Sequence, residues 1–133
     1  MTNTASLDTS LIIRVLTRDD FKKCKKVLGL LASGDYFILS DLALYETVYV
    51  LEVVYEKPRG EIVDLINFFL TRYDDVVQYN RELTSVVFPF YLAHPKLSFA
   101  DCCLATMAEL DNAEPLFTFD KKLAQQHPSA KLL

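Results

Sequence analysis

Short apolar runs alternate along the chain with longer segments whose apolar residues recur every three or four positions. A short apolar run bounded by polar residues is typical of a strand, and the longer spacing is typical of a helix with one buried side. On this basis we predict strands at 4–7, 36–40, 75–79, 115–119 and 130–133. The predicted helices span 10–17, 19–33, 42–56, 59–73, 82–94, 98–110 and 120–126.

The predicted elements differ in how clearly the pattern marks them. The segment "TASL" at 4–7 is polar for a strand, whereas "YFILS" at 36–40 has the pattern of a buried strand. We expect Pro58 to end the helix before it and Pro89 to kink its own helix, because proline has no N–H to donate. One side of the second predicted helix carries the apolar residues that we expect to be buried: Phe21, Val27, Leu28 and Leu31.

Strands that alternate with helices predict a mainly parallel sheet covered by helices on both faces, which is a three-layer α/β/α sandwich. The 133 residues suit one domain of ordinary size, so we predict a single domain over 1–133. In such sheets ligands bind beyond the carboxyl ends of the strands, where the next helices begin. Chemically active side chains are therefore expected at those points.

The composition indicates a folded globular protein, with 51% hydrophobic and 24% charged residues. The net charge of −4 argues against a surface covered with nucleic-acid-binding charge. Basic residues gathered at one place can still bind phosphate. The candidates are six lysines, each of which also fits a solvated helix face: Lys22, Lys23, Lys25, Lys26, Lys121 and Lys122.

Cysteine and histidine usage points to no disulfide framework and no zinc site. Cys102 and Cys103 are adjacent, and we expect them to act as small apolar side chains in a reducing cytoplasm. We expect His94 and His127 at the surface or at helix ends. The start "MTNTASL" lacks the features of a signal peptide, and no apolar run reaches the ~18 residues of a membrane span. These features predict a soluble cytoplasmic protein.

Four carboxylates lie at or near points where predicted helices begin. Asp8 and Asp120 each follow a predicted strand and precede a helix, so each also fits an ordinary helix N-cap. Ser98 and Asp101 fit the S-x-x-D pattern of a capping box. Taken singly, Asp8, Asp101 and Asp120 are explained by capping.

Glu46 is not explained by capping. Its helix face carries apolar residues at spacings of three, four and seven: Ala43, Val50 and Val53. This spacing predicts a buried glutamate, which needs a metal ion or an ion-pair partner. Arg14 is a candidate for that partner.

Parallel strands can gather these four acids at one edge of the sheet, where their mutual repulsion calls for a positive charge among them. Oxygen ligands without histidine or cysteine suit Mg²⁺ or Mn²⁺. Such a metal polarises a phosphate and activates water for attack on it. Thr9, Ser10 and Thr118 flank the acids, where they either orient a carboxylate or water, or cap helices.

Four segments, in their order and at their distances, resemble the PIN-domain family: "LDTSLIIRVL", "LSDLALYETVYVLEVVY", "LSFADCCLATMAEL" and "PLFTFDKKLA". The similarity runs from about Ala5 to the end of the chain and is most like the toxin ribonucleases of VapBC toxin–antitoxin systems. It implies a ribonuclease that depends on Mg²⁺ or Mn²⁺. The family's acidic site falls on Asp8, Glu46, Asp101 and Asp120, its first hydroxyl on Thr9 or Ser10, and the threonine of its T-x-D motif on Thr118.

The resemblance also implies an RNA substrate, a small antitoxin protein that blocks the acidic cleft, and a homodimer. The apolar helices around 62–70 or 45–55 are candidates for the dimer surface. The chain departs from the family in its polar first strand and in Asn112, which stands where a glycine is common. Asparagine tolerates the left-handed conformation that a helix end needs.

Two other functions compete with this hypothesis. A phosphatase or phosphotransferase with an aspartate nucleophile needs a second aspartate two residues further on, and Ser10 occupies that position. A PIN-like scaffold that binds RNA or protein without cutting is the second alternative. The complete set of four acids favours a metal-dependent endoribonuclease over both.

Overall fold

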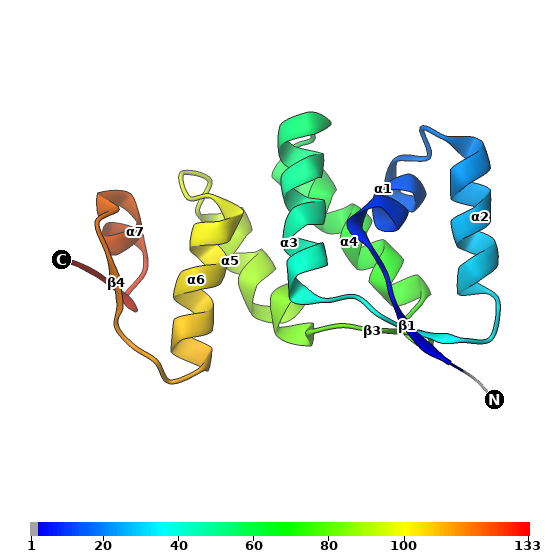
Figure 1. Cartoon of the computed structure of the whole chain (residues 1–133). Coiled ribbons are helices and arrows are strands. Elements are labelled where there is room, and N and C mark those ends of the chain that lie inside the picture. The colour runs from blue at the N-terminus through cyan, green and yellow to red at the C-terminus, as the bar shows by residue number, and fades with distance from the viewer. Residues whose placement is uncertain (1–2) are drawn as a thin grey trace. The chain divides into compact units, whose positions relative to one another are not determined.

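The computed structural model describes residues 3–133, which divide into two compact units, one ending at Asn80 and the other beginning at Arg81. Each unit combines helices with parallel strands (Figure 1). All three strand pairings within residues 3–133 are parallel. The predicted α/β class with a parallel sheet is therefore confirmed.

The first unit alternates strands with helical segments. Its elements are β1 (Thr4–Ser6), α1 (Thr9–Thr17), α2 (Phe21–Leu31), β2 (Tyr36–Ile38), α3 (Asp41–Tyr49), the π-helical η1 (Val50–Val54), α4 (Arg59–Arg72) and β3 (Val77–Gln78). β2 pairs with both other strands, with Phe37 opposite Ala5 and Val77. Because all three strands run the same way, α1 and α3 begin at the same edge of the sheet. The buried face of this unit includes Ile12, Val48, Ile62 and Phe69.

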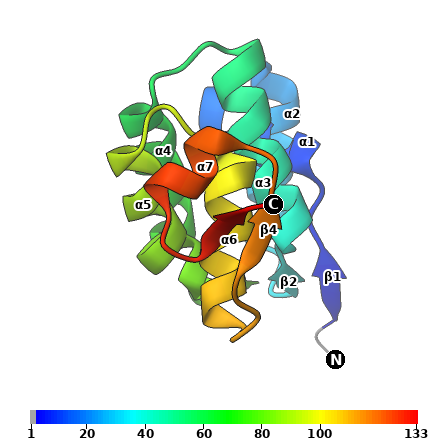
Figure 2. The ribbon, with the colours of Figure 1, turned by 90° about the vertical axis from the view of Figure 1, so that its left-hand side faces the viewer.

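The second unit has a smaller parallel pair of strands. Its elements are the π-helical η2 (Leu83–Val87), α5 (Phe88–Ala93), α6 (Phe99–Leu110), β4 (Leu116–Thr118), α7 (Lys121–Gln126) and β5 (Ala130–Leu132). In Figure 2 β4 leads into α7, and the chain then ends beside β4. The Phe99 ring packs against the rings of Phe88 and Tyr91, at centroid distances of 5.7 and 5.1 Å.

Side-chain caps explain where most of the longer helices begin. The hydroxyls of Ser40 and Ser98 accept backbone N–H groups at the starts of α3 and α6, at 3.2 and 3.1 Å. Carboxylates do the same for α1, α2 and α7, through Asp8, Asp20 and Asp120. The caps satisfy N–H groups that have no partner inside the helix. The capping predictions for Asp8, Asp120 and Ser98 are thus confirmed.

Three expectations about burial and helix ends need correction. Phe21, which we expected on the buried side of α2, is 80% exposed, and Cys24 is buried there instead. Phe21 is the first residue of α2, and a side chain that leans toward the helix N-terminus there points beyond the helix. In β2, Phe37 is buried but Tyr36 and Ile38 are exposed, because successive side chains of a strand face opposite ways. The helix predicted at 42–56, which we expected Pro58 to end, stops at the end of η1, at Val54.

The two π-helical segments mark where the chain leaves regular α-helix. η1 continues α3 directly, and η2 continues directly into α5. Pro89 lies at the start of α5, where it cannot donate to the preceding turn. The helix type changes just before Pro89, and the kink expected there stays a prediction.

Candidate functional site

Asp8 and Glu46 line one pocket of about 320 Å³, although 38 positions separate them in the sequence. Asp8 follows β1 and begins α1, and Glu46 lies on α3, which follows β2. Because β1 and β2 are adjacent and parallel, the two helices start side by side. The other residues of the wall are Thr9, Ser10, Ile13, Arg14, Val50, Val54 and Tyr55.

Asp8 is exposed and is held by its own helix start. Its Oδ2 accepts the Ser10 backbone N–H at 3.2 Å and the Ser10 hydroxyl at 2.6 Å. These two bonds stabilise the charged form, and the hydroxyl of Ser10 contributes most to lowering the pKa of Asp8 below its usual value of 3.8. The backbone N–H of Thr9 also lowers the pKa of Asp8, so the charged carboxylate is stabilised by the first residues of its own helix.

Glu46 is exposed rather than buried, so that prediction was wrong. Its Oε2 lies 3.0 Å from the hydroxyl oxygen of Thr9, which is itself 6% exposed and 3.2 Å from the Ala43 carbonyl. A hydroxyl has one proton to donate, so the carboxylate and the carbonyl compete for it. The prediction that Thr9 orients a carboxylate fits this contact between α1 and α3.

Two residues of the pocket wall, Arg14 and Tyr55, belong to a polar network around Asp19. Arg14 donates to Asp19 at 2.8 Å, and the hydroxyls of Tyr55 and Thr17 donate to the same carboxylate at 2.6 and 2.9 Å. These bonds, with that from Tyr55 the largest contribution and that from Arg14 the next, lower the pKa of Asp19 to about 2. Arg14 thus pairs with Asp19 and not, as considered from the sequence, with Glu46.

Asp101 and Asp120 belong to the second unit. Asp101 is the third residue of α6 and half-buried, and its backbone N–H donates to the Ser98 hydroxyl. Asp120 is exposed and accepts the N–H groups of two α7 residues at 2.9 and 3.2 Å. The Thr118 hydroxyl accepts the Asp120 backbone N–H at 3.0 Å. Each of the two acids is therefore fixed at a helix start.

The described part of the chain, residues 3–133, contains no group of three or more His, Cys, Asp or Glu side chains placed to hold a metal ion. Of the four predicted acids, the structure brings Asp8 together with Glu46, and with them Thr9 and Ser10. Sequence reasoning missed Tyr55 and Asp19, whose contact joins positions 36 residues apart. No local pattern marks such a pair.

Neither histidine lines the pocket of Asp8 and Glu46. His127 is only 3% exposed, which corrects the expected surface position, although it does follow the last residue of α7. Its Nδ1 accepts the Ser129 N–H at 3.0 Å, and its Nε2 lies 3.8 Å from a Glu109 carboxylate oxygen. His94 stacks on the Phe90 ring at a centroid distance of 3.8 Å. Cys24, Cys102 and Cys103 are buried and form no disulfide, as expected of small apolar side chains.

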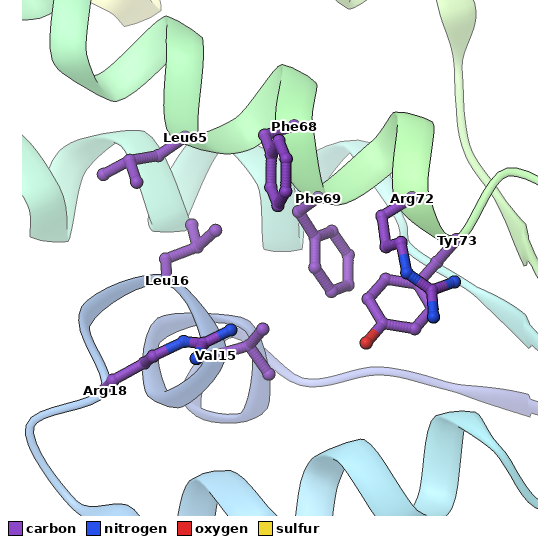
Figure 3. A pocket seen from close by; sticks show the side chains of 8 residues that line it. All are labelled: Val15, Leu16, Arg18, Leu65, Phe68, Phe69, Arg72 and Tyr73. Carbon is purple, nitrogen blue, oxygen red and sulfur yellow. The ribbon is translucent and has the colours of Figure 1, made fainter.

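Two further hollows flank α1. One, of about 300 Å³, lies between α1 and α4, where Leu16 faces Phe68 and Phe69 and two guanidiniums, Arg18 and Arg72, lie at the margin (Figure 3). No carboxylate lines it. The other, of about 360 Å³, lies between α1 and α2 and is lined partly by lysines. Neither has the acidic character of the Asp8 pocket.

The two carboxylates lie beyond the carboxyl ends of parallel strands, which is where open α/β sheets bind their ligands. The family model described as "PIN domain" matches residues 5–127, and the chain belongs to the PIN domain family. PIN domains are generally metal-dependent nucleases that act on RNA or DNA. A search of curated proteins finds no match. Within residues 3–133, no helix is long and apolar enough to cross a membrane.

Proposed function

We propose that this PIN-domain protein is an endoribonuclease of the VapC toxin kind, which hydrolyses RNA phosphodiesters at a four-carboxylate site. The observation that supports it most is the pocket shared by Asp8 and Glu46. Capping alone explains Asp8, but it does not explain why a second carboxylate from α3 faces the same hollow. An exposed acid pair beside a sheet edge suits the binding of a cation, which in turn can bind a phosphate.

The donor chemistry fits a hard divalent cation. Both carboxylates are exposed, both offer oxygen, and neither histidine nor cysteine lines the pocket. Asp8, Glu46, Asp101 and Asp120 would hold Mg²⁺ or Mn²⁺ directly or through water. When bound, the cation supplies charge that polarises the phosphate and activates the attacking water.

The chain's own residues fix these ligands in place. Ser10 holds one oxygen of Asp8 through its backbone N–H and its hydroxyl. Thr9 holds one oxygen of Glu46, and Thr118 holds the backbone of Asp120. Fixed carboxylates lose little entropy when they bind a cation, which is the usual value of such supporting bonds.

The proposal extends to protein partners and to the chain as a whole. An antitoxin that covers the acids and a second copy of the chain would both need exposed apolar surface. On the helices named for a dimer, Tyr49, Val53, Val54 and Phe68 are 61, 53, 66 and 73% exposed, respectively. We propose that residues 1–133 act as one PIN-like domain in the cytoplasm.

The test is cleavage of a mixed RNA pool by the purified chain in Mn²⁺ or Mg²⁺ and in EDTA. Asp8→Asn is the decisive variant, because asparagine caps a helix about as well as aspartate but carries no charge. Asp64→Asn, an exposed change on α4, is the matched control. Metal-dependent cutting that Asp8→Asn abolishes and Asp64→Asn retains supports the proposal. Binding of RNA without cutting in any metal, by folded chain free of any inhibitor, would favour the non-catalytic scaffold.

A further inference from the structure

The groove between α1 and α2 is lined by three cationic side chains. α1 contributes Ser10, Leu11 and Arg14, and α2 contributes Lys23, Lys26, Val27 and Leu30. The spacing of three and four residues puts the α2 members on one side of the helix. The volume of about 360 Å³ is at the small end of the range for ligand sites. The groove therefore has an apolar floor and a basic rim.

The charge on this rim is open to a ligand. Lys23 and Lys26 are exposed, and neither ammonium forms an ion pair within residues 3–133. Arg14 already donates to Asp19, but through one nitrogen of its guanidinium. No carboxylate lines the groove. In a chain with net charge −4, this is a local site for an anion.

The groove shares two wall residues with the acid pocket. Ser10 and Arg14 line both hollows, and the Ser10 hydroxyl donates to Asp8. Along α1 these two residues are one turn apart, a rise of ~6 Å. A polymer bound in the groove would therefore pass directly into the pocket that holds Asp8 and Glu46.

We propose that the α1–α2 groove binds the single-stranded RNA next to the phosphate that is cut, with Lys23 and Lys26 on the backbone phosphates. The apolar floor of Leu11, Val27 and Leu30 suits the face of an unstacked base or sugar, which a single strand offers and a duplex hides. The assignment rests on the proposed nuclease function for its choice of RNA. The basic rim and its junction with the acid pocket are observed independently of that function.

The experiment compares two double variants of the full chain for binding of a fluorescently labelled single-stranded RNA in EDTA, where no metal-dependent cleavage occurs. Lys23→Gln/Lys26→Gln removes the groove lysines. Lys22→Gln/Lys25→Gln is the matched control, since it removes the same charge from exposed positions of the same helix that do not line the groove. Thermal unfolding of each variant verifies that it is folded.

We expect the groove variant to bind RNA roughly tenfold more weakly at low salt, and the control to bind within about threefold of the unaltered chain. Losing two phosphate contacts should also reduce the slope of log affinity against log salt by about 1.4, at ~0.7 for each contact to a single strand. Equal losses in both variants, or no loss in either, would overturn the groove assignment. Binding of an acidic peptide to the same variants is measured in parallel. If the groove variant binds RNA normally but has lost binding of the peptide, the groove binds protein and the RNA assignment is wrong.

The outcomes separate this inference from the nuclease proposal. If the chain cuts RNA with metal and the groove variant binds RNA normally, the nuclease proposal stands and the groove assignment is rejected. If the chain cuts no RNA in any metal but the groove variant alone binds RNA more weakly, the groove assignment stands and the nuclease proposal is rejected.

Discussion

Replacing Thr9 with valine tests whether the contact between α1 and α3 supports the acid pair. Valine has nearly the shape of threonine, so the packing of this buried residue is kept while its hydroxyl is lost. The change removes the bonds to Glu46 and to the Ala43 carbonyl, at 3.0 and 3.2 Å. Only one of them carries the proton, so the structure predicts the loss of one hydrogen bond in net terms.

The expected effect on stability is small. One hydrogen bond contributes about 1 kcal/mol, and Glu46 is exposed, so water replaces part of what the carboxylate loses. The melting temperature should fall by about 3–5 °C for a chain of this length. The expected effect on function is larger, because a freed Glu46 holds a cation less well. Loss of a supporting bond to a metal ligand typically lowers affinity or activity by roughly ten- to a hundredfold.

The assay is thermal unfolding followed by circular dichroism, together with RNA cleavage over a range of Mn²⁺ concentrations. Thr47→Val is the matched control, because Thr47 is also buried and also donates to the Ala43 carbonyl, at 2.7 Å, but does not contact Glu46. We expect the Mn²⁺ concentration that gives half-maximal cleavage to rise in Thr9→Val and to stay unchanged in Thr47→Val. If both variants lose the same small stability and keep the same Mn²⁺ dependence, Thr9 serves packing alone and the argument for Glu46 fails.

Two predictions concern stability in the second unit. Burial lowers the pKa of His127 below 6.5, against the raising influence of Glu109 and Glu114 and with a smaller lowering influence of His94. The unfolded chain then binds the proton more readily, so the stability due to neutral His127 is complete above pH 6.5 and is lost as the pH falls through the folded pKa. Urea unfolding from about pH 7 to about pH 5 should show a flatter pH dependence in His127→Gln, and an unchanged slope would contradict the burial argument. Asn112 has φ of 54°, so Asn112→Ala should lower the free energy of unfolding by about 1 kcal/mol and Asn112→Gly should not; equal effects would count against backbone strain there.

Local sequence patterns predicted most of the helices and strands. The last long helix was predicted at 98–110 and lies at Phe99–Leu110, because its serine cap and apolar spacing are both local signals. The left-handed conformation expected of Asn112 is confirmed, since it depends on the residue type and the helix end alone. The acids at the helix starts were also predicted from local signals, because a strand followed by a capping aspartate is a pattern of consecutive residues.

Burial could not be predicted with the same success, because it depends on contacts between distant segments. The spacing that grouped Glu46 with Val53 assumes a regular α-helix, but the chain changes to π-helix at Val50 and the faces no longer align. Val53 is 53% exposed. His127 is buried by Phe90 and other residues far from it in the sequence, at a ring-centroid distance of 4.7 Å for Phe90.

The measurement that tests the four-acid site most directly is Mn²⁺ binding, followed by electron paramagnetic resonance of the free ion. It requires the unaltered chain, Asp8→Asn from the first unit, Asp120→Asn from the second, and Asp64→Asn as the control. Both site variants keep a helix cap, so a loss of affinity reports on the charge. We expect Asp8→Asn and Asp120→Asn each to weaken Mn²⁺ binding by at least about tenfold, with Asp64→Asn unchanged. Full affinity in Asp120→Asn would contradict the proposed four-carboxylate site.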